Sequence, residues 1–255
     1  MKMLLTGFMF TAMAGIAMAQ DVIIVGEVHD NLYHHQIQAS IVRETEPKAL
    51  VFEMLSSEQA ALITPELYDD PQQLAEILAW DASGWPDFEM YFPIFTNASD
   101  ATVFGAAIPR NKLPDPNASD LETSFAKGVY FFGSDRVTDA DEQQTREELQ
   151  HAAHCNALPA SMLPYMVNVQ RMRDAAIATA VLQAFYKTDG PVVVITGNGH
   201  ARRDWGVPAY LTEWAPDLKV KVIGLTEDDA PLEGGYDQII STSAVARPDP
   251  CTAFR

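Results

Sequence analysis

The fold of this chain is decided by one short stretch near its start, Asp21-Val22-Ile23-Ile24-Val25-Gly26-Glu27-Val28-His29. The β-branched run ends at a glycine, and such a run is typical of a strand that is buried on both faces. Similar apolar runs occur at residues 50–52, 191–196 and 220–225. Strands buried on both faces belong to parallel sheets that helices cover on each side. The sequence therefore predicts an α/β fold.

Helical segments alternate with these strands, as such a fold requires. Helices are predicted over residues 32–44, 57–62, 74–79, 138–153, 166–186 and 208–214. Further strands are predicted at 101–107 and, at the sheet edge, 239–240, with a loop at 111–120 and an ambiguous segment at 129–135. The alternation implies parallel strands joined by right-handed crossovers. We expect a single domain with a mostly parallel central sheet flanked by helices, and the aromatic residues of segment 80–93 as a cap over one sheet edge.

The N-terminal segment has the pattern of an export signal. Lys2 precedes the apolar run Met3–Ala17, which leads into Ala17-Met18-Ala19. This pattern predicts a signal peptide over residues 1–19, cleaved near Ala19, and a periplasmic mature domain over residues 20–255. The alternative is an uncleaved anchor, but the run is shorter than the roughly 20 residues that a spanning helix needs. No cysteine stands at the cleavage point, so a lipoprotein is not expected.

The composition limits the classes of partner. Acidic residues number 35 against 17 basic ones, and the formal net charge is −18. This charge opposes non-specific binding to nucleic acid or anionic lipid, so neither is expected as a partner. An anionic ligand would need local basic groups. The two cysteines, Cys155 and Cys251, are expected to form a disulfide in an oxidising compartment, with thiolate ligation as the alternative.

Chemically active side chains follow the predicted strands. Glu27 and His29 follow the first strand, Glu53 follows the second, and His200 follows the strand at 191–196. Ligands of open parallel sheets bind outside the carboxyl ends of the strands, so these four side chains are expected to converge. Histidine and carboxylate ligands suit a transition metal. The alternative is a polar network that satisfies the strand ends.

The remaining histidines and the glycine turn give weaker signals. His34 and His35 lie on the first predicted helix, where we expect one to face the site and the other to face solvent. His151 and His154 share a helix face and could bind metal, although a solvated face is the expectation for His151. The turn Gly197-Asn198-Gly199 is expected to use positive φ for close ligand approach. It lacks the phosphate-binding Lys-Ser/Thr, which disfavours nucleotides.

Several motifs taken together resemble one known family. They are Gly26-Glu27-Val28-His29-Asp30-Asn31 with His34, His35 and Gln38, then Trp85-Pro86-Asp87-Phe88, His154-Cys155-Asn156-Ala157-Leu158-Pro159, Gln170-Arg171-Met172-Arg173-Asp174 and Gly197-Asn198-Gly199-His200-Ala201-Arg202. This set resembles the ChaN-like haem-binding uptake family, whose superfamily also includes Tiki-type metalloproteases and erythromycin esterases. Asn156 departs from the family pattern, which has glycine there.

The resemblance implies a protein that binds haem or an iron complex for haem or iron uptake. In the family, haem is held at a dimer interface, with a tyrosine on the iron and basic or histidine groups at the propionates. Here that implies a homodimer and an outer-membrane haem uptake system as partners. The candidate tyrosines are Tyr33, Tyr91, Tyr165 and Tyr210. The other candidate haem-binding residues are His29, His34, His35, Arg171, His200 and Arg202, and Arg110 and Arg173 are further arginines able to pair with carboxylates. For any single arginine, pairing within the protein is the alternative.

A metal-dependent hydrolase is the second hypothesis. A divalent transition metal would be held by residues drawn from Glu27, His29, His154 and His200, with Glu53 as general base on bound water. No Gly-x-Ser-x-Gly elbow is present, so an ordinary serine hydrolase has no support. A third hypothesis, an interaction protein with a vestigial site, has no positive support in the sequence.

Overall fold

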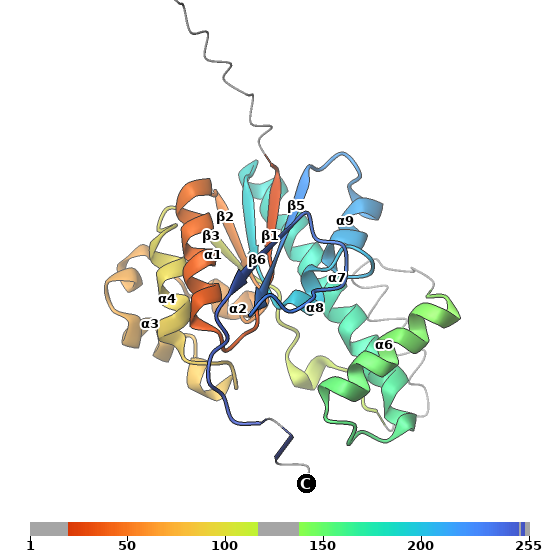
Figure 1. The fold of residues 1–255 in the computed structure, drawn as a ribbon. Coiled ribbons are helices and arrows are strands. Elements are labelled where there is room, and N and C mark those ends of the chain that lie inside the picture. The colour runs from red at the N-terminus through yellow and green to blue at the C-terminus, as the bar shows by residue number, and fades with distance from the viewer. Residues whose placement is uncertain (1–19, 117–137, 250, 253–255) are drawn as a thin grey trace, which may run out of the picture.

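A six-stranded parallel sheet forms the centre of the computed structural model (Figure 1). Its strand order is β3-β2-β4-β1-β5-β6. The strands are β1 (Val22–Val25), β2 (Ala49–Phe52), β3 (Thr102–Gly105), β4 (Val192–Ile195), β5 (Val220–Glu227) and β6 (Gln238–Thr242). The structure describes residues 20–116, 138–249 and 251–252. The predicted signal peptide, the ambiguous segment 129–135 and the end of the predicted loop 111–120 lie outside these residues.

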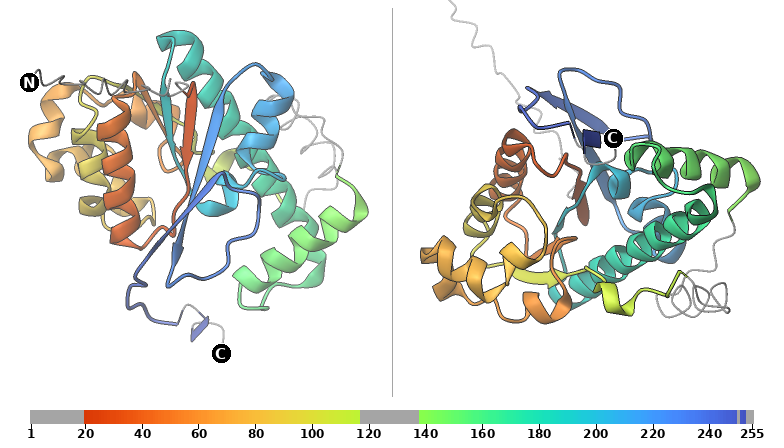
Figure 2. Two further views of the ribbon diagram at one scale, coloured as in Figure 1. Left: turned by 45° about the horizontal axis from the view of Figure 1, so that its top comes forward. Right: turned by 90° about the horizontal axis from the view of Figure 1, so that it is seen from below.

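Helices cover both faces of the sheet (Figures 1 and 2). The α-helices are α1 (Leu32–Thr45), α2 (Ser57–Ala60), α3 (Pro71–Ile77), α4 (Phe88–Thr96), α6 (Ala140–Ala153), α7 (Leu163–Thr188), α8 (Asn198–Ala201) and α9 (Val207–Trp214). Short 3-10 turns are η1 (Pro65–Asp69), η2 (Trp80–Ala82), η3 (Arg110–Lys112) and η4 (Ala160–Met162). Within the described residues, no helix is both long enough and apolar enough to cross a bilayer.

Alternate residues of each strand enter two separate cores. In β2, Leu50 and Phe52 pack with α1, α3 and α4, whereas Ala49 and Val51 pack with α7 and α9. All four residues are fully buried, as expected for a strand covered on both faces. The predicted buried strands and the α/β fold class are therefore confirmed.

The connections that leave the neighbouring strands β1 and β4 run in opposite directions across the sheet. From β1 it continues through α1 to β2 on one side, and from β4 it continues through α9 to β5 on the other. In such sheets, the crevice at the carboxyl ends of the two strands flanking this switch point is the usual ligand site. The segments that leave these two strands carry Glu27 with His29 and Gly197 with His200. Glu53 follows β2, the next strand beyond β4.

Three local predictions need correction. Helix α2 ends at Ala60, two residues before the predicted end. The glycine turn after β4 is the single helical turn α8, and neither Gly197 nor Gly199 has a positive φ. Most of the aromatic segment is core: Trp80, Phe88 and Tyr91 are at most 5% exposed, and α4 packs against α1. Trp85 is the aromatic residue of this segment that lines cavities at the sheet edge.

The C-terminal tail is fastened at two points. Cys155, just beyond α6, forms the predicted disulfide with Cys251 across 96 residues of sequence. Between β6 and this disulfide, the Arg247 guanidinium donates to both carboxylate oxygens of Glu227, at 2.7 and 2.6 Å, and to Asp30 at 2.8 Å. The tail therefore links the α6–α7 connection to the carboxyl edge of the sheet.

Removing this disulfide should destabilise the protein. In Cys155→Ser/Cys251→Ser, we expect the free energy of unfolding to fall by about 2–5 kcal/mol, because a long loop is no longer closed in the unfolded chain. Denaturant unfolding of the oxidised wild type and of the variant measures the difference. The wild type with reductant should match the variant, and equal stability of all three samples would contradict this role for the disulfide.

Candidate functional site

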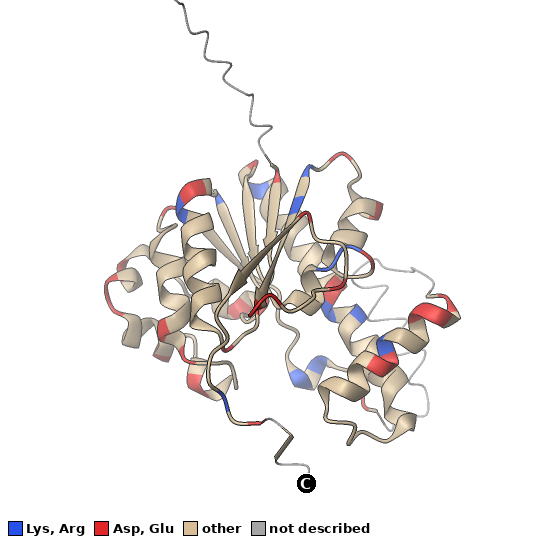
Figure 3. Ribbon diagram, in the orientation of Figure 1, with Lys and Arg blue, Asp and Glu red and all other residues tan. Residues whose placement is uncertain are grey.

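Acidic residues lie at the carboxyl edge of the sheet, and both basic and acidic residues lie near its amino edge (Figure 3). Glu27 is the most connected of the carboxylates and is 2% exposed. Its Oε1 accepts hydrogen bonds from His29 Nδ1 at 2.6 Å and from the Tyr91 hydroxyl at 2.8 Å. Its Oε2 accepts from Gln38 Nε2 at 2.6 Å. Helix α1 supplies Gln38 and helix α4 supplies Tyr91, so both helices are fixed to the end of β1 through this carboxylate.

His29 is the histidine of this group that reaches open space, with a side chain 34% exposed. Burial alone would lower its pKa, but the hydrogen bond to Glu27 and the nearby Glu53 carboxylate raise the pKa to about 9. Its ring lies 4.8 Å from the ring of Trp85. Nδ1 is held by Glu27, and with this raised pKa Nε2 also carries a proton at neutral pH, so a metal that binds Nε2 must displace that proton.

Gly197, just beyond β4, leaves room for the His29 ring. A Cβ added at Gly197 would lie 2.8 Å from His29 Nε2, closer than real Cβ contacts allow. A Cβ added at Gly199, two residues on, would meet nothing within 4 Å. The glycine predicted to allow close approach therefore does so, but the group that approaches is His29 and the backbone remains in an ordinary conformation.

Glu53 is held as a carboxylate. Its Oε2 accepts from the Thr196 hydroxyl at 2.6 Å and from the Gly197 N–H at 2.8 Å, and its Oε1 lies 3.4 Å from His200 Nε2. Burial alone would raise the pKa of Glu53, but His200, His29 and these two hydrogen bonds lower it to about 2. Glu53 is therefore ionised, and His200 and His29 balance its negative charge.

A buried charge chain continues from Glu53 into α7 and α6. His200 Nδ1 donates to Asp174 Oδ1 at 2.6 Å, and Asp174 Oδ2 lies 3.5 Å from Arg146. Burial raises the pKa of Asp174. Burial alone would lower the pKa of His200, but Glu53 and Asp174 raise it above its usual value. Arg146 also donates to Glu142 at 3.0 Å, so the chain ends in an ion pair on α6.

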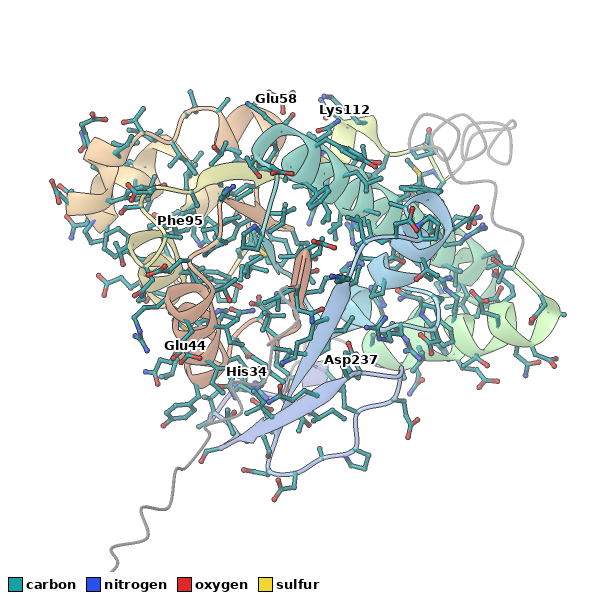
Figure 4. The ribbon with its side chains drawn as sticks, turned by 90° about the horizontal axis from the view of Figure 1, so that it is seen from above. His34, Glu44, Glu58, Phe95, Lys112 and Asp237 are labelled. Atoms are coloured by element: carbon teal, nitrogen blue, oxygen red, sulfur yellow. A yellow bond between two sulfur atoms is a disulfide. The ribbon has the colours of Figure 1, made fainter. Side chains whose placement is uncertain are left out.

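The prediction for His34 and His35 was wrong, because both are fully buried. His34 Nδ1 accepts from the Val28 N–H at 2.9 Å, and Nε2 lies 3.3 Å from the Thr226 carbonyl of β5. Figure 4 labels His34 beside α1. Burial lowers the pKa of His34. His35 Nε2 lies 2.8 Å from the His29 carbonyl oxygen and holds the backbone of the site. Both histidines support the loop after β1 and leave ligand contact to His29.

The candidate tyrosines lie in four different surroundings. Burial and Glu27 raise the pKa of Tyr91, whose hydroxyl is occupied, so this residue supports Glu27. Tyr210 is 1% exposed and donates to the Arg171 carbonyl at 3.3 Å. Tyr165 donates to the Pro114 carbonyl at 2.9 Å. Tyr33 is exposed on α1.

The other predicted residues lie at or beyond the margin of the site. Arg202 lies with its guanidinium carbon 3.5 Å from the Trp205 ring centroid and is paired with Asp204 at 2.6 Å. Arg171 donates to Asn168 at 3.4 Å on the same helix. His154 caps the end of α6, where Nδ1 lies 2.8 Å from the Gln150 carbonyl. Within the described ranges, no group of three or more His, Cys, Asp or Glu side chains could hold a metal ion.

Two cavities open at this edge. The first has a volume of about 580 Å³ and is lined by Glu27, His29, Glu53 and His200 together with α6 and α7. The second has a volume of about 550 Å³ and shares Glu53, Trp85 and Arg173 with the first. Ligand and cofactor pockets typically have volumes of roughly 300–1,000 Å³. All four predicted strand-end residues thus line one cavity of suitable size.

Three residues were not predicted as site residues: Asp174, which closes the motif of residues 170–174, Arg146 and Trp205. Asp174 is an acid within the apolar face of the longest helix, and such a buried charge needs a partner. That signal was present in the sequence, but it does not identify His200 as the partner. Arg146 and Trp205 carried no signal, because their roles depend on how α6 and α8 pack.

The fold and the site together define a parallel α/β protein with a polar site at the carboxyl edge, beside the topological switch point. The chain belongs to the family described as haem-binding uptake, Tiki superfamily, ChaN, whose model matches residues 13–211. No curated protein matches it.

A solved structure with a TM-score above 0.5 shows the same fold. ChaN of Campylobacter jejuni, described as binding heme cofacially, is 17% identical, with 84% of each chain covered and a TM-score of 0.59. A Bacillus cereus protein is 12% identical, covering 91% of this chain and 72% of its own, with a TM-score of 0.46. A succinoglycan biosynthesis protein is 12% identical, covering 82% and 67%, with a TM-score of 0.47. We draw nothing from the last two.

The ionised state of Glu53 predicts a specific loss of stability in acid. Because the folded pKa of about 2 lies below the usual 4.5, this group stabilises the fold above pH 4.5, and the contribution is lost as the pH falls through 2. In Glu53→Gln, we expect the stability difference between pH 4.5 and 2 to shrink by up to about 3 kcal/mol. Denaturant unfolding at several pH values measures it. Equal losses in the two proteins would show that Glu53 is not held as a carboxylate.

Proposed function

We propose that this chain binds haem in the first cavity and serves haem or iron uptake in the periplasm. The observation that carries the proposal is the presentation of His29 to this cavity. A histidine whose Nδ1 is held by a carboxylate keeps one orientation, and its Nε2 is a stronger metal ligand once the metal has displaced the Nε2 proton. Glu27 holds His29 in this way. Membership of the haem-binding uptake family supports the same ligand.

The other groups of the first cavity fit a flat, partly apolar ligand. Trp85 and Trp205 line it, with Leu149 and Val167 from α6 and α7. Arg202 lies against the Trp205 ring and is itself paired with Asp204, so the ring is fixed by a charged neighbour. Haem, when bound, supplies the iron and the porphyrin face. The chain supplies a nitrogen from His29 and aromatic walls from the two tryptophans.

No tyrosine is among the described residues that line the first cavity, so histidine is the iron ligand that this cavity offers. The hydroxyls of Tyr91 and Tyr210 are buried and donate to groups of the protein. A raised pKa disfavours the phenolate form of Tyr91, the form in which tyrosine binds iron best. This proposal departs from the tyrosine ligation that the family resemblance implies.

The hydrolase hypothesis gains no support from this geometry. Its metal ligands would have to be free, but Glu27 accepts three hydrogen bonds and His200 is paired with Asp174 and Glu53. His154 is occupied at the end of α6. We therefore keep haem binding as the one proposed function.

The proposal also covers the location of the protein and the system that delivers its ligand. We propose export to the periplasm with cleavage near Ala19, and delivery of haem by an outer-membrane uptake system. The N-terminal sequence pattern supports the first of these. A homodimer stays a prediction from the family resemblance, and the molar mass of the hemin-loaded protein in solution tests it.

Hemin titration of the mature protein tests the haem site. We expect a saturable, shifted Soret band for the wild type. Changes to outer-shell partners typically lower metal affinity by about 10–100-fold. In His29→Ala the affinity for hemin should fall by more than this, because the ligand itself is lost.

A glycine variant provides a second test. Gly197→Ala places a methyl group against His29 Nε2 and should weaken hemin binding like His29→Ala. Arg43→Gln changes an exposed side chain that bonds to Ser40 on α1, so this control should bind hemin like the wild type. Equal hemin binding by the wild type, His29→Ala and Gly197→Ala would overturn ligation by His29. A spectrum that resembles free hemin throughout would overturn haem binding.

A further inference from the structure

Helix α6 is a loosely packed wall of the first cavity. Its residues Leu149, Gln150 and Ala153 line the cavity, yet no residue of α6 belongs to a hydrophobic cluster in the described parts of the chain. Arg146 is the buried residue of this helix, and it lies 3.5 Å from Asp174 of α7. A helix with so few buried apolar contacts opens locally unless another attachment holds it.

The C-terminal tail provides that attachment. Cys155, two residues beyond the last residue of α6, is bonded to Cys251 of the tail. The backbone turns sharply there, because Cys155 and Asn156 have φ values of 59° and 56°. Residues other than glycine rarely adopt this left-handed conformation. The disulfide therefore fastens the end of α6 at a strained turn.

The other end of the tail is fixed to a different wall of the same cavity. Arg247 donates to the Asp30 carboxylate at 2.8 Å, and Asn31 donates to the Ser243 carbonyl at 3.0 Å. Asp30 and Asn31 directly follow His29, which lines the first cavity. Seen from below, the tail lies between β6 and α6 (Figure 2, right). The tail thus joins the two walls of the cavity as a strap.

We infer that the Cys155–Cys251 disulfide is a redox-sensitive fastening of this strap, and that its reduction lets α6 move away from the first cavity. One thiolate of a dithiol reductant attacks a sulfur of the bond, forms a mixed disulfide and releases the other cysteine. The second thiol of the reductant then closes the disulfide of the reductant and releases the first cysteine. Two electrons and two protons pass to the protein, which gains two thiols. Both cysteines are partly exposed, so a reductant has access to them.

The element that moves on reduction is α6, because the tail keeps its other contacts. Besides the bonds of Arg247 and Ser243, the Ala244 N–H donates to Asp228 at 3.0 Å. By contrast, the N–H groups of Cys155 and Asn156 donate to carbonyls of residues 152 and 151, within the same turn. Movement of α6 widens the first cavity. Where the proposed function holds, on which this consequence rests, it also lets bound haem leave.

Hydrogen–deuterium exchange of the ligand-free mature protein tests the strap. The samples are the oxidised wild type, the wild type with a dithiol reductant, and Cys155→Ser/Cys251→Ser. Lower global stability speeds exchange through global unfolding by the same factor in every element. We expect protection of α6 to fall by about tenfold or more beyond the fall in β1 and β4, and reoxidation to restore it. The double variant should show this pattern without reductant and should not respond to reductant.

Transfer of hemin to an excess of haem-free myoglobin measures access to the first cavity. The double variant replaces the reductant in this experiment, because a reductant also reduces the iron. We expect transfer from the double variant to be about tenfold or more faster than from the oxidised wild type, since a wall of the cavity is released. Arg43→Gln, which changes an exposed side chain bonded to Ser40, is the control and should match the wild type.

Two results overturn the inference. The first is unchanged protection of α6, or an equal loss in every element, because the disulfide then stabilises the fold without holding α6. The second is equal hemin transfer from the wild type and the double variant. If α6 opens on reduction but hemin does not bind to the wild type, the inference stands and the proposed function fails.

Discussion

Burial of the Glu27 carboxylate is the constraint on which the rest of the site depends. A buried charge is tolerated only when hydrogen bonds and opposite charge replace its hydration. At Glu27 these come from three directions: Tyr91 on α4, Gln38 on α1 and His29 in the loop after β1. The carboxylate therefore fixes two helices against the end of the central strand. It also sets the orientation of the His29 ring, so the fold and the chemistry of the cavity depend on the same atoms.

A second chain of charged side chains ties helices to a strand end on the opposite face of the sheet. It runs from Glu53, after β2, through His200 of α8 and Asp174 of α7 to Arg146 of α6. Helices α6 and α7 form one wall of the first cavity, so this chain determines where that wall stands. The disulfide at Cys155 fastens the end of the same pair of helices to the C-terminal tail. The cavity is thus bounded by elements that are each tied to a strand end.

The sequence was sufficient for the parts of this arrangement that follow from strand topology. Glu27, His29, Glu53 and His200 stand directly after strands, and parallel strands end at one edge, so their convergence could be predicted without side-chain detail. Helix residues were harder to assign. The register of a helix shows which face is buried but not which buried polar group meets which partner. His34 was misassigned for this reason: its position between α1 and the β5 carbonyl at Thr226 depends on the packing of α1 against the sheet.

The balance of charges at the sheet edge determines the kind of ligand it can accept. Glu27 is compensated by His29, Glu53 by His200, and Asp174 by His200 and Arg146. These groups therefore contribute little net charge to the two cavities, in spite of the acidic surface of the protein. Arg110 and Arg173 add positive charge to the lining of these cavities, beside the His29 ring and two tryptophan rings. A ligand that combines a flat apolar face, a metal centre and a carboxylate would meet a complementary group for each of its parts, which a small neutral ligand or a bare metal ion would not.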